Sequence, residues 1–452
     1  MIEIIKRECI LSPLDDYCIF EGKSAKLIDS VLSSGICGRG YSGLPVKDKW
    51  TAFREKEGSK EIVCLFSGLC ANALAEENSD AVFTGVALTA NAFGVTEAWI
   101  VSDTEIDVPA ECFGVHFNTF KIEHTLTAGE ETLVFAGIEG RIPITSPQPP
   151  YSVEKGLFGH PTLFHSAEFF AHIPYLLSGT DSDTKLCYIS GDGAKEGIYE
   201  ICLGTRLSEI VSLAGAGDIK AVQTGGICGP ILADDRLAIE YDYEAFARAG
   251  IAFGDGSVRI LGKDRCIARE LYLALGEAYR SSCGRCVFCR EGLYQMYLLM
   301  EDVVKGKAND GALSLIKDLA SVIKGNAGCD YGKMTASMVC GVFSAFYDEI
   351  EAHTRAKCQA LACPGMFTVH ILPDKCKGCG KCISRCQISA IEGGEGMIHV
   401  INQSSCTQCL ECMPCDDGGI VKAGMVKPAG PEHPVPVGTF VQKKKGLQRR
   451  TV

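Results

Sequence analysis

The spacing of the cysteines near the C-terminus constrains this chain more than any other feature. Residues 376–386 read CKGCGKCISRC, and residues 406–415 read CTQCLECMPC. Thiolates at this spacing can each bind one corner of an iron–sulfur cube, and Gly378 and Gly380 in the first run let the backbone curl around it. The two runs therefore predict two [4Fe-4S] clusters, and a pair of structural zinc sites is the alternative.

The first run has the C-x2-C-x2-C-x3-C spacing of a bacterial ferredoxin, whereas the second is one residue shorter before its last cysteine. In two-cluster ferredoxins the fourth cysteine of each run binds the other cluster. This rule assigns one cluster to Cys376, Cys379, Cys382 and Cys415, and the other to Cys406, Cys409, Cys412 and Cys386. Because of the short second run, Cys415 is the least regular of these ligands.

The remaining composition favours metal ligation over disulfide formation. Nine of the 25 cysteines are scattered over residues 1–265, where we interpret them as small buried apolar residues, and sixteen lie from Cys266 onward. The N-terminus lacks the features of a signal peptide, and no apolar stretch is long enough to predict a membrane span. We therefore expect a cytoplasmic protein, where disulfides are rare.

Length and charge set further bounds. The 452 residues allow about three domains. The net charge of −12 argues against non-specific nucleic-acid binding, which needs many contacts from Lys and Arg to phosphate. A basic run within residues 443–450 is interpreted as a solvated tail.

A third cysteine set lies upstream, at Cys283, Cys286 and Cys289. Apolar spacing predicts helices over residues 269–280, 294–304, 313–323 and 334–350 around it. The three cysteines need a fourth ligand to hold a [4Fe-4S] cluster. Cys329 follows a glycine-containing segment that suits a loop beside the cluster, whereas Cys340 falls within the helix expected over residues 334–350, so we prefer Cys329.

At this motif the chain resembles a known family. SCGRCVFCREG (282–292) is similar to the cluster motif of the NADH-binding flavoprotein subunit of respiratory complex I. The same subunit occurs as the beta subunit of NAD-linked, electron-bifurcating iron hydrogenases, and the C-terminal two-cluster ferredoxin resembles the hydrogenase version. Further segments agree in order: SGICGRGYSGLPVKDKW (34–50), AGEETLVFAGIEGR (128–141), PPYSVEKGLFGHPT (149–162) and KLCYISGDGAKEGIYEICLGT (185–205).

The resemblance implies a multidomain fold of α/β and α+β parts. Residues 1–183 would form a Rossmann-like, flavin-type α/β domain, and residues 184–262 a β-grasp domain. Residues 263–355 would form a helical bundle with one [4Fe-4S] cluster, and residues 356–452 a bacterial 2[4Fe-4S] ferredoxin domain with a basic tail. Short alternating strands around residues 186–190 and 198–202, followed by a helix over 207–213, agree with the second of these.

The resemblance also implies a flavin site, which this sequence alters. A glycine-rich loop with Gly38, Arg39 and Gly40, followed by Lys49, would hold the FMN phosphate. Glu130 and Glu131 match the family's acidic segment, or form only a helix N-terminus.

Two segments in particular depart from the family pattern. Uncharged Leu65–Cys70 replaces an acidic segment that touches both flavin and nucleotide, and its apolar side chains are expected to fill the pocket. His165-Ser166 replaces a pair of asparagines, although a protonated His165 could still meet a phosphate. Each lost hydrogen bond weakens binding by about 0.5–1.5 kcal/mol. We therefore expect a degenerate site that binds FMN and NAD(P) weakly.

A fourth metal site is implied by the similarity to hydrogenase subunits. There, the equivalents of His353, Cys358 and Cys363 hold a zinc together with an upstream cysteine, and Cys266 is the upstream cysteine near the bundle that no cluster uses. Such a Cys3His set is a common structural zinc site. The alternative is that the cysteines are buried apolar residues and the histidine lies on a helix surface.

Three functions compete. The first is an iron–sulfur electron-transfer subunit of a multi-subunit, NAD(P)-linked and electron-bifurcating oxidoreductase from anaerobic metabolism, of hydrogenase or formate dehydrogenase type. Its partners would be iron–sulfur and flavin subunits, with ferredoxin as a further candidate. The second is an active FMN-containing NAD(P)H dehydrogenase subunit that passes electrons from the nucleotide to the clusters. The third, a non-redox assembly scaffold, leaves the clustered cysteines without a purpose.

Overall fold

The computed structural model describes residues 3–40, 45–127, 129–415 and 417–441. The chain divides into two compact units. The first comprises residues 1–263, 271–298 and 313–346, and the second comprises residues 264–270, 299–312 and 347–452. The bundle expected over residues 263–355 therefore contributes to both units. Within the described ranges, no helix combines the length and apolar character that crossing a bilayer requires.

A five-stranded sheet forms the first layer of the first unit, with strand order β4-β5-β3-β2-β6. Its strands are β2 (Glu61–Phe66), β3 (Glu97–Ser102), β4 (Glu111–Cys112), β5 (Val115–Lys121) and β6 (Thr162–Ser166). The four strands other than β4 are parallel, and β4 runs antiparallel to β5. In such open parallel sheets, ligands bind beyond the carboxyl ends of the strands.

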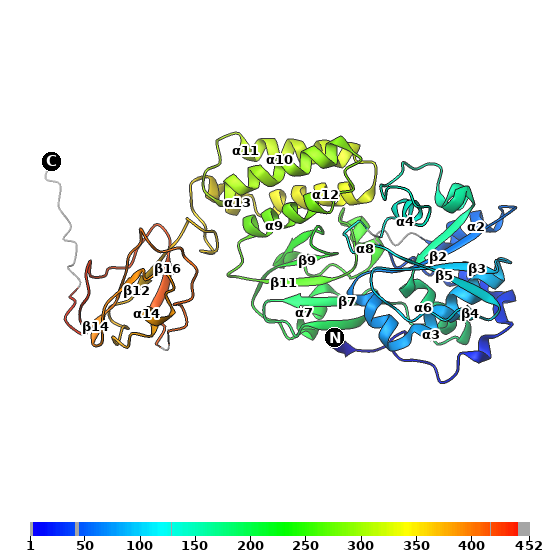
Figure 1. Ribbon diagram of the computed structural model, residues 1–452, viewed down its shortest axis with the longest axis horizontal. Coiled ribbons are helices and arrows are strands. Elements are labelled where there is room, and N and C mark those ends of the chain that lie inside the picture. The colour runs from blue at the N-terminus through cyan, green and yellow to red at the C-terminus, as the bar shows by residue number, and fades with distance from the viewer. Residues whose placement is uncertain (1–2, 41–44, 128, 416, 442–452) are drawn as a thin grey trace. The chain divides into compact units, whose positions relative to one another are not determined.

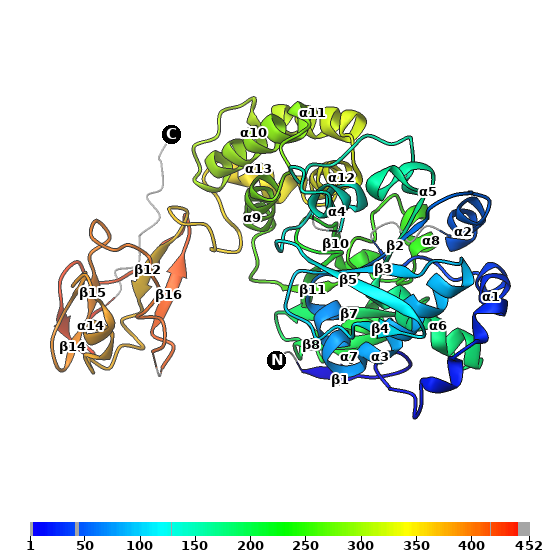
Figure 2. The ribbon, with the colours of Figure 1, turned by 45° about the vertical axis from the view of Figure 1, so that its right-hand side comes forward.

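Helices cover both faces of this sheet (Figures 1 and 2). The helices before β7 are α1 (Leu27–Ser34), α2 (Val46–Arg54), α3 (Leu69–Ala92), α4 (Glu131–Ile138), α5 (Ser152–Lys155) and α6 (Ala167–Ser178). Short 3-10 turns η1 (Cys18–Phe20), η2 (Lys23–Lys26) and η3 (Leu157–Gly159) connect them. Successive side chains of β2 point to opposite faces of the sheet. Cys64 packs in the core with α3 and α6, while Val63 packs with α4.

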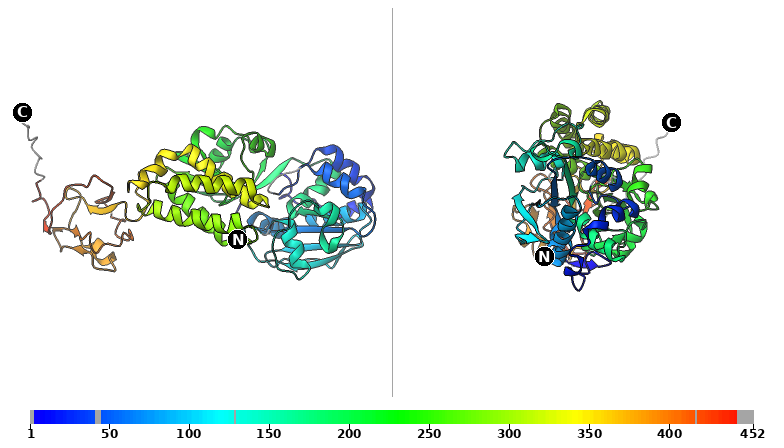
Figure 3. Two further views of the ribbon diagram at one scale, coloured as in Figure 1. Left: turned by 90° about the horizontal axis from the view of Figure 1, so that it is seen from above. Right: turned by 90° about the vertical axis from the view of Figure 1, so that its right-hand side faces the viewer.

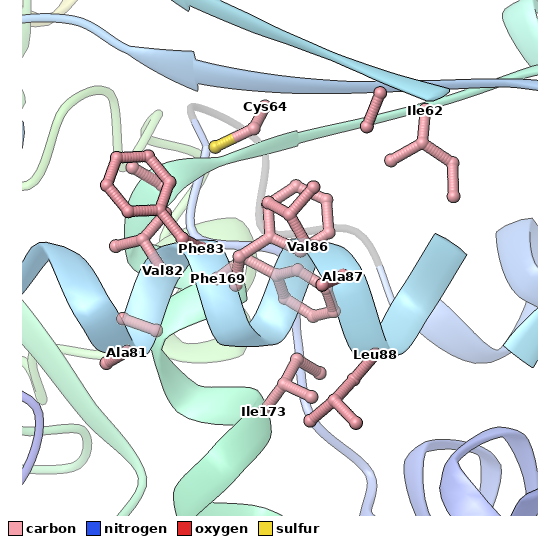
Figure 4. Packing of buried hydrophobic residues seen from close by; sticks show 14 of the residues in the cluster. Ile62, Cys64, Ala81, Val82, Phe83, Val86, Ala87, Leu88, Phe169 and Ile173 are labelled. Atoms are coloured by element: carbon pink, nitrogen blue, oxygen red, sulfur yellow. The ribbon is translucent and has the colours of Figure 1, made fainter. Parts of the chain in front are cut away.

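The core beneath β2 is built by α3 and α6. Figure 4 shows Val86 and Phe83 of α3 facing Cys64, with Phe169 and Ile173 of α6 alongside. The two helices approach closely at Gly85, where a Cβ atom would lie 2.0 Å from a backbone oxygen of α6. Glycine at this position therefore permits the contact that positions both helix N-termini beside the sheet.

A second, six-stranded sheet has the order β1-β8-β7-β11-β9-β10. Its strands are β1 (Ile4–Lys6), β7 (Thr184–Gly191), β8 (Gly197–Cys202), β9 (Ile219–Thr224), β10 (Ile231–Ala233) and β11 (Val258–Gly262). Helices α7 (Leu207–Leu213) and α8 (Tyr243–Arg248), with the turn η4 (Asp234–Arg236), connect them. The two strands expected around residues 186–190 and 198–202 are present, and so is the helix expected over 207–213.

The N-terminal strand belongs to this second sheet, although it was expected with residues 1–183. β1 runs parallel to β8. The fully buried carboxylate of Glu200 on β8 accepts backbone N–H groups from Ile10 at 2.8 Å and Glu8 at 2.9 Å. It also accepts the hydroxyl of Thr184 at 2.8 Å. A buried carboxylate is stable only with such donors, so it fixes the N-terminal segment against this sheet.

Five helices follow: α9 (Ile267–Arg280), α10 (Val287–Val304), α11 (Ala312–Asn326), α12 (Asp330–Ala345) and α13 (Tyr347–Thr354). The long helices lie side by side (Figures 1 and 3). Tyr272 of α9 stacks on Tyr297 of α10, with ring centroids 5.1 Å apart. The single helix expected over residues 334–350 is wrong, because Phe346 has non-helical dihedral angles and separates α12 from α13.

The C-terminal part of the second unit consists of short strands and loops. Its elements are β12 (Thr368–Ile371), α14 (Lys381–Arg385), β13 (Ile391–Glu392), β14 (Met397–Ile398), β15 (Val400–Ile401), β16 (Ile420–Ala423) and β17 (Val435–Pro436). They pair antiparallel as β12 with β16, β13 with β15, and β14 with β17. A small apolar core at residues such as Phe367 and Val369 contacts several of the clustered cysteines. The basic run at 443–450 lies outside the described residues.

Candidate iron–sulfur and metal sites

Two cavities in the C-terminal part receive the clustered cysteines. The lining of the first includes Cys376, Cys379, Cys382 and Cys415. The lining of the second includes Cys386, Cys406, Cys409 and Cys412. These are the two groups that the crossed ligand rule predicts, and Cys412 also reaches the wall of the first cavity. Four thiols around each concave space fit the four corners of an iron–sulfur cube.

The first cavity also contains a side chain that sequence reasoning missed. Nδ1 of His399 lies 3.6 Å from Sγ of Cys382 and 3.7 Å from Sγ of Cys376. The residue is only 2% exposed. No ligand spacing marks this histidine in the sequence, because it comes from a segment beyond the cysteine run.

The four cysteines of the bundle motif gather at the beginning of α12. Cys329 is the residue that precedes this helix. The neighbouring thiols of Cys329, Cys283 and Cys286 act on Cys289, whose pKa rises to about 11, mainly because of burial and then because of these thiols. Cys340 lies eleven residues along the chain from Cys329, or about 16 Å at 1.5 Å per residue of helix. The structure thus places Cys329, and not Cys340, with the other three.

A glycine and two hydroxyl groups lie close to these cysteines. A Cβ atom at Gly328 would lie 3.2 Å from Sγ of Cys286. The hydroxyl of Ser282 lies 3.6 Å from Sγ of Cys289, and that of Thr145 lies 3.6 Å from Sγ of Cys283. These hydroxyls can donate to thiolates, which tunes an iron–sulfur cluster. Thr145 precedes α5 in the sequence, so this contact spans 138 residues and local spacing could not reveal it.

The proposed zinc ligands form a compact buried group. One ligand atom from each of Cys266, His353, Cys358 and Cys363 lies within 4.8 Å of every other. Nε2 of His353 is 3.1 Å from Sγ of Cys266 and 3.4 Å from Sγ of Cys363, and the two sulfurs are 3.5 Å apart. A tetrahedral zinc with Zn–S bonds near 2.3 Å requires sulfurs about 3.8 Å apart, so the set fits zinc.

Electrostatics at this site stabilises one thiolate, that of Cys358, and raises the pKa values of Cys266 and Cys363. Nδ1 of His353 lies 2.7 Å from the backbone oxygen of Glu349, so it carries the proton and leaves Nε2 facing the thiols. Burial would lower the pKa of His353, but its contacts with Cys266 and Cys358 outweigh this and raise the pKa to about 10. Without metal, Nε2 therefore carries a second proton, which a bound metal would displace. Hydrogen bonds from Cys266 and Cys363 hold the pKa of Cys358 far below its usual range. A thiolate, the form that binds metal, is thereby stabilised.

The basic residues of the glycine-rich loop are paired within the protein. The buried Arg39 donates Nε to the carbonyl of Thr184 at 2.9 Å and binds the carboxylate of Asp183 at 2.5 Å. Lys49 donates to the carbonyl of Phe164 at 2.8 Å and to Glu131 at 3.3 Å. Gly38 is half-buried and Gly40 exposed. The rest of the loop, residues 41–44, lies outside the described residues.

The two glutamates are occupied as well. Glu130 caps α4, since its Oε2 accepts the N–H of Leu133 at 2.9 Å. Oε1 of Glu131 accepts the hydroxyl of Ser152 at 2.6 Å. Burial raises the pKa of Glu130. Burial acts in the same direction on Glu131, but Lys49 and the hydroxyl of Ser152 outweigh it and lower its pKa. In this structure both carboxylates accept hydrogen bonds at the N-terminus of α4 or from its surroundings.

The segment that replaces the family's acidic stretch connects β2 to α3. Phe66 is buried in the core, as expected, but the expectation that Leu69 fills a pocket is wrong, because this residue is 45% exposed. Asp103, at the end of β3, was not anticipated. Its Oδ2 accepts the backbone N–H of Gly68 at 2.8 Å and the hydroxyl of Ser67 at 3.0 Å. A carboxylate of the protein itself thus lies at the N-terminus of α3, where a phosphate would otherwise be favoured.

His165 cannot meet a phosphate as a cation, contrary to the expectation. Its ring is buried and stacks on Phe169 with centroids 4.0 Å apart. Nε2 accepts the indole N–H of Trp50 at 3.1 Å. Burial, with a smaller contribution from Lys49, lowers the pKa of His165 well below its usual value. The imidazole is therefore neutral and forms part of the core.

Comparisons with known proteins agree with this geometry. Residues 274–353 match the NADH-ubiquinone oxidoreductase-F iron-sulfur binding region, and residues 369–392 match the 4Fe-4S binding domain. The chain thus carries the iron–sulfur regions of a redox protein.

Individual relatives show which kinds of redox protein this chain is similar to. HndC, a component of the NADP-reducing hydrogenase of Solidesulfovibrio fructosivorans, is 28% identical, over 88% of this chain and 93% of that protein. The F component of the NADH-quinone oxidoreductase of Streptomyces coelicolor is 26% identical, over 72% of this chain and 82% of that protein. A chain of an NAD+-reducing [NiFe]-hydrogenase has a similar fold, with a TM-score of 0.70 at 22% identity over 78% of this chain and 68% of that chain. The chain is thus similar, over most of its length, to iron–sulfur components of a hydrogenase and of an NADH-quinone oxidoreductase.

Proposed function

We propose that this protein is an electron-transfer subunit of a multi-subunit, NAD(P)-linked oxidoreductase, in which three [4Fe-4S] clusters form the path and the flavin site is degenerate. The observation that carries the proposal is the gathering of twelve cysteines into three sets of four. The protein's part is to fix the spacing of the clusters, bury them, and donate hydrogen bonds to their sulfurs.

The loss of the flavin site is supported by the pairing of its basic residues. Arg39 and Lys49 each donate to backbone carbonyls and carboxylates of the protein, and His165 is a neutral core residue. An FMN phosphate would have to displace these partners, and near α3 it would meet the carboxylate of Asp103. Exchanging charged hydrogen bonds in this way costs about 1.5–3 kcal/mol each, which would weaken binding by orders of magnitude.

We also propose a zinc site and a β-grasp domain for this protein. The Cys266, His353, Cys358 and Cys363 set would hold a structural zinc that ties residue 266 to the segment leading into the ferredoxin part. The parallel pairing of β7 with β11, with a hairpin and a helix between them in sequence, supports a β-grasp domain at residues 184–262.

The partners would be further iron–sulfur and flavin subunits, because this chain needs another source of electrons if it binds no flavin. The relatives described above are components of a hydrogenase and of an NADH-quinone oxidoreductase, which supports a heteromeric assembly. Electron bifurcation and exchange with ferredoxin would then belong to the assembly. The competing function, an active FMN-containing NAD(P)H dehydrogenase subunit, keeps the same clusters but needs a working flavin site.

One preparation separates the two functions. Protein purified without oxygen is precipitated with acid, and the supernatant is examined for flavin absorbance while iron and sulfide are determined on the same sample. We expect about twelve iron atoms per chain, four for each cluster, and no stoichiometric flavin. Replacing Cys379 by Ser should remove one ferredoxin cluster and leave the bundle cluster intact. About four or fewer iron atoms would overturn the electron path, and one flavin per chain would favour the dehydrogenase.

A further inference from the structure

His399 stands in a position that the cluster ligands alone do not explain. Its Nδ1 atom approaches two cysteine sulfurs of the same predicted cluster, Cys376 at 3.7 Å and Cys382 at 3.6 Å. The residue is 2% exposed, and among the described residues Nε2 has no hydrogen-bond partner. The polar neighbours of the ring are thus these two sulfurs and the backbone of Gly394.

The surrounding backbone is shaped to hold this ring. Gly393 faces the imidazole so closely that a Cβ atom there would lie 2.1 Å from Cδ2 of His399. Gly393 also has a φ of 150°, which residues other than glycine rarely adopt. His399 lies between β14 and β15. Ile398 and Ile401, close to it in sequence, are buried as well.

The distances identify a hydrogen bond and not a metal bond. Each ligand of an iron–sulfur cube binds a different corner, so a nitrogen bound to iron would stand well apart from the other ligand sulfurs. A nitrogen 3.6–3.7 Å from two sulfurs is instead at hydrogen-bonding distance from both. Thiolates only accept hydrogen bonds, so Nδ1 carries the hydrogen and donates it.

We propose that His399 is a tuning residue for one cluster of the ferredoxin part, the cluster held by Cys376, Cys379, Cys382 and Cys415. The Nδ1–H group donates to the sulfurs of Cys376 and Cys382 and stabilises the more negative, reduced state over the oxidised one. The reduction potential of this cluster is thereby raised relative to the same cluster without the donor. This inference rests on the clusters of the proposed function.

The test is a redox titration of the whole protein, followed by electron paramagnetic resonance. Replacing His399 by Leu removes the donor, and we expect one ferredoxin cluster to become about tenfold harder to reduce, a shift of about 59 mV for one electron. The signals of the other two clusters should stay unchanged. Replacing His399 by Asn keeps an N–H donor near the position of Nδ1 and should restore part of the shift.

The matched control is His370, on β12 of the same part of the chain. Its Nε2 is paired with the hydroxyl of Thr368 at 2.7 Å. Replacing His370 by Leu removes a histidine without removing a sulfur contact, and we expect no change in any potential. Equal shifts in the His370 and His399 variants would overturn the inference, as would a His399 variant with full iron content and unaltered potentials.

A second measurement avoids substitution. Protein labelled with nitrogen-15 at histidine should show a nitrogen hyperfine coupling to one reduced ferredoxin cluster, transmitted through the N–H to sulfur contact. Absence of this coupling in protein with full iron content would contradict the inference alone. Absence of the clusters themselves, measured as iron and sulfide, would instead contradict the proposed function.

Discussion

Trp50 donates its indole N–H to Nε2 of His165 across 3.1 Å, and this bond fixes the histidine as an acceptor inside the core. Trp50 is fully buried, and its ring also meets Phe169, with centroids 6.1 Å apart. The pair occupies the point where β6 ends and α6 is about to begin, an edge of the sheet at which flavin nucleotides commonly bind. At this point the edge of the sheet is apolar core.

Calorimetric titration of the cluster-loaded protein with FMN and with NADH tests this consequence. Because the donors and cations near the site are paired within the protein, we expect no binding of either compound at micromolar concentration. Heat that saturates at one FMN per chain would contradict the prediction and support a flavin enzyme. Cluster content is checked by visible absorbance before and after each titration, so that damaged protein is not mistaken for protein without a site.

The fourth ligand of the bundle cluster can be tested by two cysteine variants. Replacing Cys329 by Ser should change the paramagnetic spectrum of that cluster, because an oxygen ligand replaces a thiolate. Replacing Cys340 by Ala should leave the spectrum unchanged, because that residue lies about three turns further along α12. The reverse pattern would exclude the assignment.

Zinc binding can be measured separately from iron. We expect one zinc atom per chain by mass spectrometry of the metal content, since the Cys3His set brings its four ligand atoms within 4.8 Å of one another. Replacing Cys363 by Ser or His353 by Gln should remove the zinc, lower the unfolding temperature and leave the iron content unchanged. The Cys340→Ala variant serves as the control that retains zinc. Protein with full iron content but no zinc would refute the site.

A buried ion pair connects α6 to the second sheet, and its loss should be costly. Nζ of Lys185 lies 2.6 Å from Oε2 of Glu168, and both side chains are buried. Burial alone would lower the pKa of Lys185, but Glu168 outweighs it and raises the pKa. The contribution is therefore complete below the unfolded value of about 10.4 and declines only as pH rises through the higher folded value.

Replacing Lys185 by Met leaves the carboxylate of Glu168 buried without its cation, which should destabilise the fold by about 3–5 kcal/mol. The Lys185→Met, Glu168→Gln double variant should recover part of the loss. As a control, the exposed pair of Lys195 and Glu3 should contribute no more than about 1 kcal/mol. Anaerobic urea denaturation followed by circular dichroism gives the comparison. An equal loss of unfolding free energy on replacing Lys185 and on replacing Lys195 would show that burial of the ion pair is not decisive.

The sequence predicted best what depends on neighbouring residues. Cysteine spacing indicated three ligand groups, because residues two to four apart can reach the same metal. Apolar spacing indicated the helices of residues 267–326. Of these, α10 begins seven residues before the range expected for it. The preference for Cys329 over Cys340 followed from the glycines before Cys329, and in the structure the thiol of Cys329 lies near that of Cys289.

The missed features depend on contacts between distant segments. His399 and Thr145 reach cluster sulfurs from other parts of the chain, and no local pattern distinguishes them from ordinary polar residues. The pairing of Trp50 with His165 spans 115 residues, and only the folded arrangement shows that it buries a histidine expected to bind phosphate. The break at Phe346 interrupts a continuous helical apolar pattern.

The attachment of the N-terminal strand to the second sheet has a practical meaning for dissecting the protein. A fragment beginning at residue 184 would lose β1 and expose the backbone of β8 as an open edge, prone to pairing with another copy. It would also bury Glu200 without the amide donors of residues 8 to 11. A fragment ending at residue 183 would carry the complementary defect. Residues 4–11 therefore contribute to the stability of the second sheet, and a cut at residue 183 or 184 would remove that contribution.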